Sequence, residues 1–177
     1  ITYNSLYNGE HYDARVAAAL AGWSGAGFDD GKWAAATNAT SAANGAVISS
    51  QLFEPIRHLA RLPPASVGLP AANVQVFDFG QNMAGVVALT GLKCAAGQNV
   101  TIRHAEVLQH PPYGPKDGNI YVGNLRSAKA TDVYITKGDP EGETFEPIFT
   151  QHGFRYVEVT GLTEPPEIGS LRAVHIR

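Results

Sequence analysis

The sequence has few of the residues that would cross-link it, carry it through a membrane or attach it to nucleic acid. Cys94 is its only cysteine, which excludes an internal disulfide and a cysteine-based metal site. No apolar run approaches the roughly 20 residues of a membrane-spanning helix. The 13 Lys and Arg residues are scattered among 16 Asp and Glu residues, with a formal net charge of -3. Without a basic stripe, we expect no nucleic-acid partner.

Sequence signatures of several enzyme classes are also missing. No Gly-x-Ser-x-Gly motif marks the nucleophile of an acyl transferase, and no phosphate-binding loop is present. The six histidines never occur at the His-x-x-x-His spacing of a zinc-binding helix. Glycoside hydrolysis needs two carboxyl groups about 5–9.5 Å apart. Glu106 and Asp117 are candidates for that pair by residue type only.

The residues that are present favour an all-β fold. The chain has 177 residues, of which 44% are hydrophobic, with 19 Gly and 11 Pro and few strong helix formers other than Ala. This length allows one domain with a core, with or without an appended piece. Beyond residue 61, apolar stretches recur about every 8–12 residues between turn residues, as in a β-sandwich or barrel. The expected strands begin near residue 67 and cover residues 74–79, 86–89, 100–105, 120–122, 130–136, 144–150, 154–160 and 171–176.

The first 60 residues have a different character. An alanine-rich segment predicts a short helix over residues 14–21, and residues 46–52 predict a modest strand. Asp29 and Asp30 lie between two tryptophans. They predict either a capped corner with aromatic packing, which we favour, or a bound cation such as calcium. Consecutive prolines at residues 63 and 64 continue neither a ladder nor a helix. We therefore place a domain junction near residues 55–64.

Residues 76–90 predict a strand, a tight turn and a second strand. The phenylalanines at 77 and 79 alternate with Val76 and Asp78 across the two faces of the first strand. Gly80 and Gly85 bracket four polar or small residues, 81–84, which we assign to the turn. The side chains of residues 81 and 82, Gln and Asn, are expected to hold this turn by bonding backbone groups.

Several predicted strands carry charged or amide side chains in their middle or at their ends, notably at residues 103–106, 124–126 and 151–156. Ion pairs between neighbouring strands would account for them, at about 0.2–1 kcal/mol for each exposed pair. Carbohydrate binding needs a similar set, because aromatic rings cover the C–H face of a sugar and carboxylates, amides and arginines meet its hydroxyls. The residues alone favour ion pairs between neighbouring strands, and a sugar-binding site is the alternative.

Several segments resemble, in order, parts of bacterial-type α-L-rhamnosidases of glycoside hydrolase family 78. YNGEHYDAR at residues 7–15 and the Gly-Trp and Gly-Phe-Asp-Asp runs within residues 22–33 are similar to the accessory region that precedes the sandwich in that family. Four further runs resemble its concanavalin-like domain: FDFGQNMAG at 77–85, RHAEVL at 103–108, NLRSAKATD at 124–132 and QHGFRYVEV at 151–159.

The resemblance implies an antiparallel concanavalin-like β-sandwich, or jelly roll, with a short N-terminal extension that contains a small helix. Residues 1–60 would be the end of an N-terminal accessory domain and a linker, and residues 61–177 the sandwich. In such enzymes the catalytic acid and base lie on an (α/α)₆ barrel that follows these β-domains. This sequence has no helical-repeat segment to form that barrel. We therefore assign no catalytic residue and expect no activity from this chain alone.

The resemblance then implies a non-catalytic accessory module that binds or positions rhamnose-containing glycans. Its other expected partner is the rest of a larger rhamnosidase-like protein, and a structural or assembly role is the alternative. Glycan binding favours an extracellular or cell-surface location over the cytoplasm. No cofactor is expected, with calcium at Asp29 and Asp30 as the one alternative. The candidate sugar-binding residues are Asp117, Asn119, Tyr121, Asn124, Arg126, His152 and Arg155.

Overall fold

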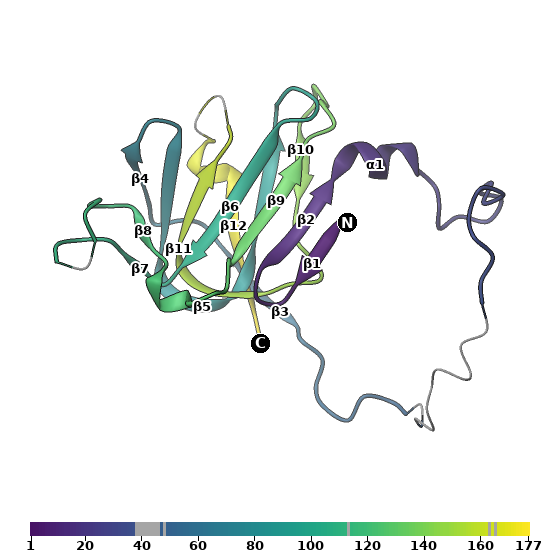
Figure 1. Cartoon of the computed structure of the whole chain (residues 1–177), viewed down its shortest axis with the longest axis horizontal. Helices are drawn as coiled ribbons and strands as arrows, with labels where there is room; N and C mark the ends of the chain where they lie inside the picture. The colour runs from purple at the N-terminus through teal and green to yellow at the C-terminus, as the bar shows by residue number, and fades with distance from the viewer. Residues whose placement is uncertain (38–46, 48, 113, 163, 165) are drawn as a thin grey trace.

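The computed structural model describes residues 1–37, 47, 49–112, 114–162, 164 and 166–177. These residues form a mostly β fold with one small α-helix (Figure 1). No helix among them is long and apolar enough to span a membrane. The elements are, in chain order, β1 (Tyr3–Ser5), β2 (Gly9–Asp13), α1 (Ala14–Ala19), β3 (His58–Leu62), β4 (Ser66–Ala71), β5 (Val74–Leu92), β6 (Asn99–Ala105), β7 (Val107–Leu108), β8 (Ile120–Tyr121), η2 (Gly123–Leu125), β9 (Thr131–Ile135), β10 (Glu143–Phe145), β11 (His152–Thr160), η3 (Ile168–Ser170) and β12 (Leu171–Ile176).

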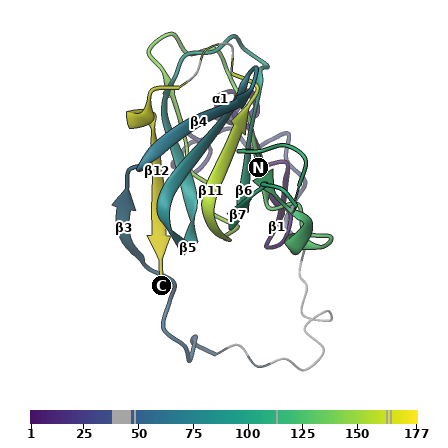
Figure 2. The same cartoon turned by 90° about the vertical axis from the view of Figure 1, so that its left-hand side faces the viewer.

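One curled sheet forms both layers of the sandwich, with the strand order β1-β2-β9-β6-β11-β5-β12-β3. The first part of the long strand β5 pairs with β4 and β11, and its second part pairs with β10 and β12. The sheet therefore folds over on itself along β5 (Figure 2). All these pairs are antiparallel except β2 with β9, which is parallel. The all-β concanavalin-like fold expected from the sequence is confirmed.

The turn predicted at residues 81–84 is wrong, because β5 continues through it. Where the register with β11 shifts, four residues of β5, 79–82, face the single residue Arg155. Gly80 has a φ of 80°, and its N–H donates to Oδ1 of Asp78 at 2.7 Å. Such an irregularity bends a strand without ending it. The glycines do mark a local irregularity. The strand nevertheless continues through it, because β5 pairs with neighbouring strands on both sides.

The hydrophobic core lies between the two parts of the curled sheet. Phe79 of β5 and Phe154 of β11 meet edge to face, with ring centroids 5.8 Å apart and planes at 81°. Fully buried aromatic and aliphatic side chains from β5, β6, β11 and β12 surround them. These core residues include Phe77, Val87, Leu89, Val100, Ile102, Val157, Val159, Leu171 and Ala173.

The N-terminal residues form a hairpin and the small helix. The predicted helix is confirmed and ends two residues early, as α1, and Asp13 caps it by accepting a hydrogen bond from the N–H of Arg15. Strands β1, β2, β3 and β7 were not predicted. The strand predicted at residues 46–52 is wrong for residues 47 and 49–52, which form no strand, and residues 46 and 48 lie outside the described residues. Strands β1 and β2 join the same sheet as the strands beyond residue 61.

Candidate functional site

Three polar side chains from distant segments meet on the surface where β6 passes into β7. Glu106, which lies between these strands, accepts a hydrogen bond at each carboxylate oxygen. Nδ2 of Asn82 donates to Oε1 at 2.9 Å, and Nδ2 of Asn124 donates to Oε2 at 3.0 Å. Both asparagines are exposed and the glutamate is half-buried. The two amides therefore orient a carboxylate that solvent can still reach. We call these three residues the Glu106 cluster.

Local backbone features bring the cluster together. Asn82 lies in the bulge of β5, and Asn124 lies in η2, which follows β8. A Cβ atom built on Gly153 of β11 would lie 3.9 Å from Oε1 of Glu106, so this strand runs close beside the carboxylate. Arg126 ends η2 with a φ of 56°, a left-handed conformation that seldom suits a residue with a Cβ. All four sandwich segments that resemble the rhamnosidase family thus contribute to this corner.

A bidentate ion pair supports the bulge that carries Asn82. Nε of Arg155 donates to Oδ1 of Asp78 at 2.8 Å, and its second nitrogen donates to Oδ2 at 2.9 Å. The guanidinium also lies 5.0 Å from the ring centroid of Tyr156. The hydrogen bond from Arg155 is the main reason that the pKa of Asp78 is lowered, against the smaller effect of burial. The pair therefore joins Asp78, at the start of the register shift in β5, to Arg155, the residue of β11 that faces the bulge.

The chemistry of the cluster suits hydroxyl recognition. An ionised carboxylate offers about four lone-pair positions, and two of them are used by the asparagines. The other positions can accept hydrogen bonds from a ligand. Each amide keeps a second N–H donor and a carbonyl oxygen. A pair of neighbouring sugar hydroxyls would find both donors and acceptors within this small area.

The sequence-predicted sugar residues separate into different environments. Asn124 belongs to the Glu106 cluster, and Arg126 is exposed directly after η2. Tyr121 lies in β8, opposite Val107 of β7. Four others lie elsewhere: Asp117 and Asn119 on the loop between β7 and β8, Arg155 in its pair with Asp78, and His152 in the interior.

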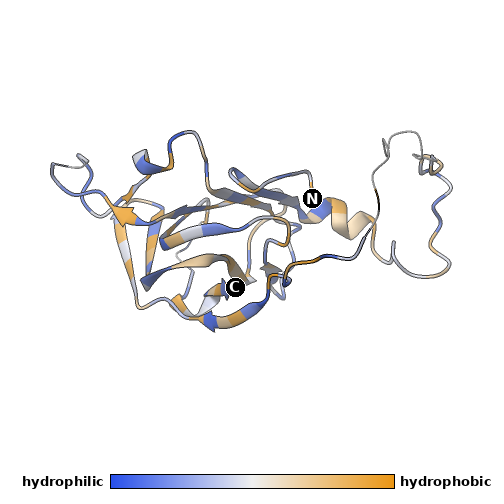
Figure 3. Cartoon of the chain, turned by 90° about the horizontal axis from the view of Figure 1, so that it is seen from below, coloured by the Kyte–Doolittle hydropathy of each residue, from blue (hydrophilic) through white to orange (hydrophobic). Residues whose placement is uncertain are grey.

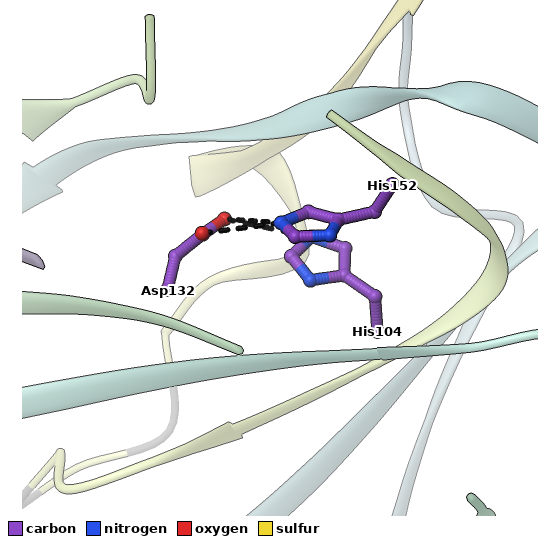
Figure 4. A group of neighbouring side chains, drawn as sticks. All are labelled: His104, Asp132 and His152. Carbon is purple, nitrogen blue, oxygen red and sulfur yellow. Dashed lines mark hydrogen bonds and ion pairs between the residues drawn. The ribbon is translucent and has the colours of Figure 1, made fainter. Parts of the chain in front are cut away.

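His152 belongs to a second, buried group with His104 and Asp132 (Figure 4). Its Nε2 donates to the carboxylate of Asp132, 3.1 Å from Oδ1 and 3.2 Å from Oδ2. The two imidazole rings stack with centroids 4.1 Å apart and planes at 25°. Nδ1 of His104 faces the carbonyl oxygen of Ala130 at 3.0 Å, so Nδ1 carries the proton. This group therefore joins β6, β9 and β11.

Burial controls the protonation of this group. Desolvation, reinforced by neighbouring His152, lowers the pKa of His104 to about 3, so the ring is neutral at pH 7. Its Nε2 has no hydrogen-bond partner among the described residues. Burial by itself raises the pKa of Asp132, but the hydrogen bond from His152 and the neighbouring imidazoles outweigh it and hold that pKa below its ordinary value.

The arrangement of the rings does not fit a metal ion held by both histidines. The ligand atoms of His104, Asp132 and His152 lie within 4.8 Å of one another, which is close enough for a metal site. A metal ion, however, lies in the plane of each imidazole at about 2 Å from the nitrogen. Planes only 25° apart, with ring centres 4.1 Å apart, intersect well beyond that distance. The three residues form a buried structural group, in which His152 is hydrogen-bonded to Asp132 and stacked on His104.

The predicted calcium site stays a prediction. Asp29 accepts a hydrogen bond from the N–H of Gly31 at 3.1 Å, as in a local turn. The rings of Trp23 and Trp33 lie 6.4 Å apart, in agreement with a corner packed by aromatics. Calcium needs six to eight oxygen ligands. Within the described residues, neither Asp29 nor Asp30 belongs to a group of three or more candidate ligands.

Sequence reasoning expected the side chain of Asn82 to bond backbone groups, whereas it donates to Glu106. It named Glu106 as a possible hydrolytic acid and as part of the polar run 103–106, without its partners. The available signal was that both residues occur in the segments that resemble the family. Their pairing needed the fold, because 24 residues separate them and neither occurs in a ligand-type spacing.

Comparisons with known proteins agree with this structure. A family model described as the bacterial alpha-L-rhamnosidase concanavalin-like domain matches residues 70–177, and one described as the alpha-L-rhamnosidase N-terminal domain matches residues 1–60. An α-L-rhamnosidase of Streptomyces avermitilis is 46% identical over 172 residues, which cover 96% of this chain and 16% of that relative.

Solved structures show the same relationship. The crystal structure of Streptomyces avermitilis α-L-rhamnosidase complexed with L-rhamnose has a TM-score of 0.84 and 44% identity, over 100% of this chain and 16% of that chain. The α-L-rhamnosidase from Dictyoglumus thermophilum also has a TM-score of 0.84, with 36% identity, over 98% of this chain and 18% of that one. The present chain, which spans less than a fifth of these relatives, belongs to the bacterial α-L-rhamnosidase family through its concanavalin-like domain.

Proposed function

We propose that this chain is a non-catalytic module of a rhamnosidase-type protein and binds rhamnose-containing glycan at the Glu106 cluster. The observation that carries the proposal is the exposed carboxylate of Glu106, oriented by amides from two other segments. A side chain fixed in this way loses little rotamer freedom when it accepts further hydrogen bonds, which favours ligand binding.

L-rhamnose has the chemistry that such a site would select. The sugar carries vicinal ring hydroxyls, which suit a carboxylate and neighbouring amides, and a methyl group in place of the hydroxymethyl group of other hexoses. Tyr121 and Arg126 are the nearest sequence-predicted residues along the chain that could add a ring face and a positive charge. The Streptomyces avermitilis relative was solved in complex with L-rhamnose, which supports this ligand class for its family member.

Isothermal titration calorimetry of the chain with L-rhamnose and a rhamnosylated oligosaccharide tests the binding. We expect saturable heat with the wild type. Glu106→Gln and Asn82→Ala should each weaken the affinity at least tenfold, about 1.4 kcal/mol. Glu141→Gln, on an exposed turn, serves as the matched control and should leave the affinity unchanged. Equal affinity of the wild type and Glu106→Gln, or no heat at millimolar sugar, would contradict the proposal.

The non-catalytic part of the proposal has its own test. The chain spans 16% of the length of the first curated relatives, so the activity in their names belongs to much longer chains. We expect no release of the aryl group from an aryl rhamnoside. Turnover that Glu106→Gln abolishes would make the chain itself a hydrolase. We also propose an extracellular or cell-surface location, where glycan polymers are met, and cell fractionation would check it.

A structural role is the second candidate. It is favoured by large apolar side chains that remain exposed in the described residues, some of them on the long segment between α1 and β3, such as Leu52 and Phe53. Figure 1 shows the described parts of that segment, residues 20–37 and 49–57, running outside the sheet. Glycan binding and assembly do not exclude each other, because the Glu106 cluster and these apolar residues do not overlap.

A further inference from the structure

Two loops at one end of the sandwich present four large apolar side chains. Leu6 and Tyr7 form the turn between β1 and β2, and Ile148 and Phe149 lie between β10 and β11. Their exposed fractions are 63%, 75%, 69% and 59%. We call these four residues the loop patch. This end of the molecule faces the viewer in Figure 3, which is seen from below.

Hydrogen bonds tie the two loops to each other. The carboxylate of Glu10, only 1% exposed, accepts at Oε2 from the N–H groups of Ile148 at 3.2 Å and Phe149 at 2.9 Å. Oγ1 of Thr150 donates to the carbonyl oxygen of Ser5 at 3.1 Å. A buried glutamate that satisfies two loop N–H groups fixes the backbone of that loop beside the hairpin.

The hairpin is fixed from its other side as well. The N–H of Ala130 donates to the carbonyl oxygen of Tyr7 at 3.0 Å, and the N–H of Thr131 donates to that of Asn8 at 2.9 Å. The loop patch therefore combines a firmly bonded backbone with side chains that have little to pack against. Single exposed apolar residues need no explanation, but a group of four on two fixed, adjacent loops is typical of an interaction surface.

We propose that the loop patch docks on an apolar surface of another part of the same rhamnosidase-type polypeptide. Two solved relatives contain this fold, each with a TM-score of 0.84. The present chain covers only 16–18% of their length, so in these relatives the fold is one part of a much larger chain. The four side chains carry no charge, which suits an apolar partner. Their fixed backbone reduces the entropy lost on docking.

The size of the patch favours a covalently linked partner over a second copy. A stable complex of separate molecules buries roughly 800 Å² on each partner, from about 20–30 residues a side. Four side chains supply much less than that. Docking between parts of one polypeptide needs less area, because the linkage provides a high effective concentration.

A chimera tests the docking. Residues 1–177 replace the matching segment of the Streptomyces avermitilis enzyme, to which they align along their whole length. The double variant Ile148→Ser/Phe149→Ser should lower the Tm of the chimera by about 3–5 °C. It should leave the Tm of the isolated chain unchanged. The matched control is Val67→Ser/Leu69→Ser on β4, where the side chains are also exposed, and it should change neither Tm.

Two results obtained with the patch variant would overturn the inference. One is a chimera whose Tm falls no further with the patch variant than with the β4 control. The other is a concentration-dependent dimer of the isolated chain, seen by analytical ultracentrifugation, that the patch variant dissociates. That result would assign the patch to a second copy.

A further check uses the solved structure of the Streptomyces avermitilis relative and needs no folded chimera. There the residues aligned with the loop patch should be covered by chain outside the aligned segment, and solvent exposure of those residues would contradict docking. Neither test depends on glycan binding.

Discussion

His152 donates from Nε2 to the carboxylate of Asp132, at 3.1 Å from Oδ1, and both side chains are almost fully buried. The same Oδ1 accepts the backbone N–H of Glu10 at 2.8 Å. Asp132 therefore links β11 to β9 and, through Glu10, to β2 in the parallel pair of the sheet. One buried carboxylate holds the N-terminal hairpin against the sandwich.

Replacing Asp132 should destabilise the whole chain. Asp132→Ala leaves the N–H of Glu10 and Nε2 of His152 without their acceptor in a buried place. We expect the free energy of unfolding to fall by about 3–5 kcal/mol, as when one partner of a buried pair is removed. Urea denaturation followed by circular dichroism measures it. The control Asp139→Ala removes a partly exposed pair with Lys137 and should cost much less. Equal losses for both variants would contradict the role of Asp132.

Acidification should destabilise the chain through His104. Its pKa is about 3 in the fold and 6.5 in the unfolded chain. Between these two pH values the unfolded chain binds a proton that the folded chain does not. The contribution of His104 to the free energy of unfolding is therefore fully present above pH 6.5 and is lost as the pH falls below it. From pH 7 to pH 5 this one group should cost about 2 kcal/mol.

The variant His104→Gln isolates this effect. Glutamine does not titrate, so the fall in unfolding free energy between pH 7 and pH 5 should be smaller than in the wild type by that amount, whatever the variant's stability at pH 7. His152 and Asp132, which face His104, remain in both proteins. An unchanged slope of unfolding free energy against pH would show that His104 is not the titrating group.

Gly9 should tolerate no side chain. It has a φ of 109°, and a Cβ atom there would lie 2.6 Å from Oδ1 of Asp132 and closer still to the carbonyl oxygen of Thr131. Gly9→Ala should therefore cost several kcal/mol, more than the roughly 1–2 kcal/mol of a left-handed backbone alone. Gly22, with a φ of 81° and open space around it, is the control. Similar Tm values for the two alanine variants would refute the close approach.

The ion pair at the bulge should be salt-sensitive. Asp78→Asn removes the charge that Arg155 meets, and we expect a modest loss of unfolding free energy because the pair is partly exposed. The difference from the wild type should narrow in 1 M salt, where charges are screened within about 3 Å. The control is Arg172→Gln. Among the described residues the guanidinium of Arg172 donates to the carbonyl oxygens of Gly169 and Leu171 and to no carboxylate, so this variant should show no such narrowing. A difference that stays constant with salt would mean that packing, and not charge, accounts for the loss.

Periodicity in the sequence predicted the central strands well and the edges poorly. β6, β9, β11 and β12 were all expected. In β6, Val100 and Ile102 alternate with Thr101 and Arg103, and β9 alternates half-buried and buried residues along its length. The strand expected at residues 144–150 is shorter, as β10, because the N–H groups of Ile148 and Phe149 bond the side chain of Glu10. β1, β2 and β3 are short and partly polar, so their pairing depends on neighbours that no local pattern reveals.

The candidate site was only partly predictable for the same reason. Asn124 was expected to meet a ligand and lies in the Glu106 cluster, whereas His152 lies in the buried group with Asp132. A polar residue in a strand can point to either face once a bulge shifts the register. The bulge opposite Arg155 decides where Asn82 points, and its extent is set by pairing with β11.

Composition, strand periodicity and the ordered segments of this chain were enough to determine its fold class and its family, because both depend on local pattern and on residue identity. The partners of its polar side chains were decided only by the tertiary structure. Glu106 meets Asn82 and Asn124, and Asp132 meets His152 and Glu10, across 18 to 122 residues. Such pairings arise when a curled sheet brings distant strands together, and hydrogen bonds then form between groups that share no sequence spacing.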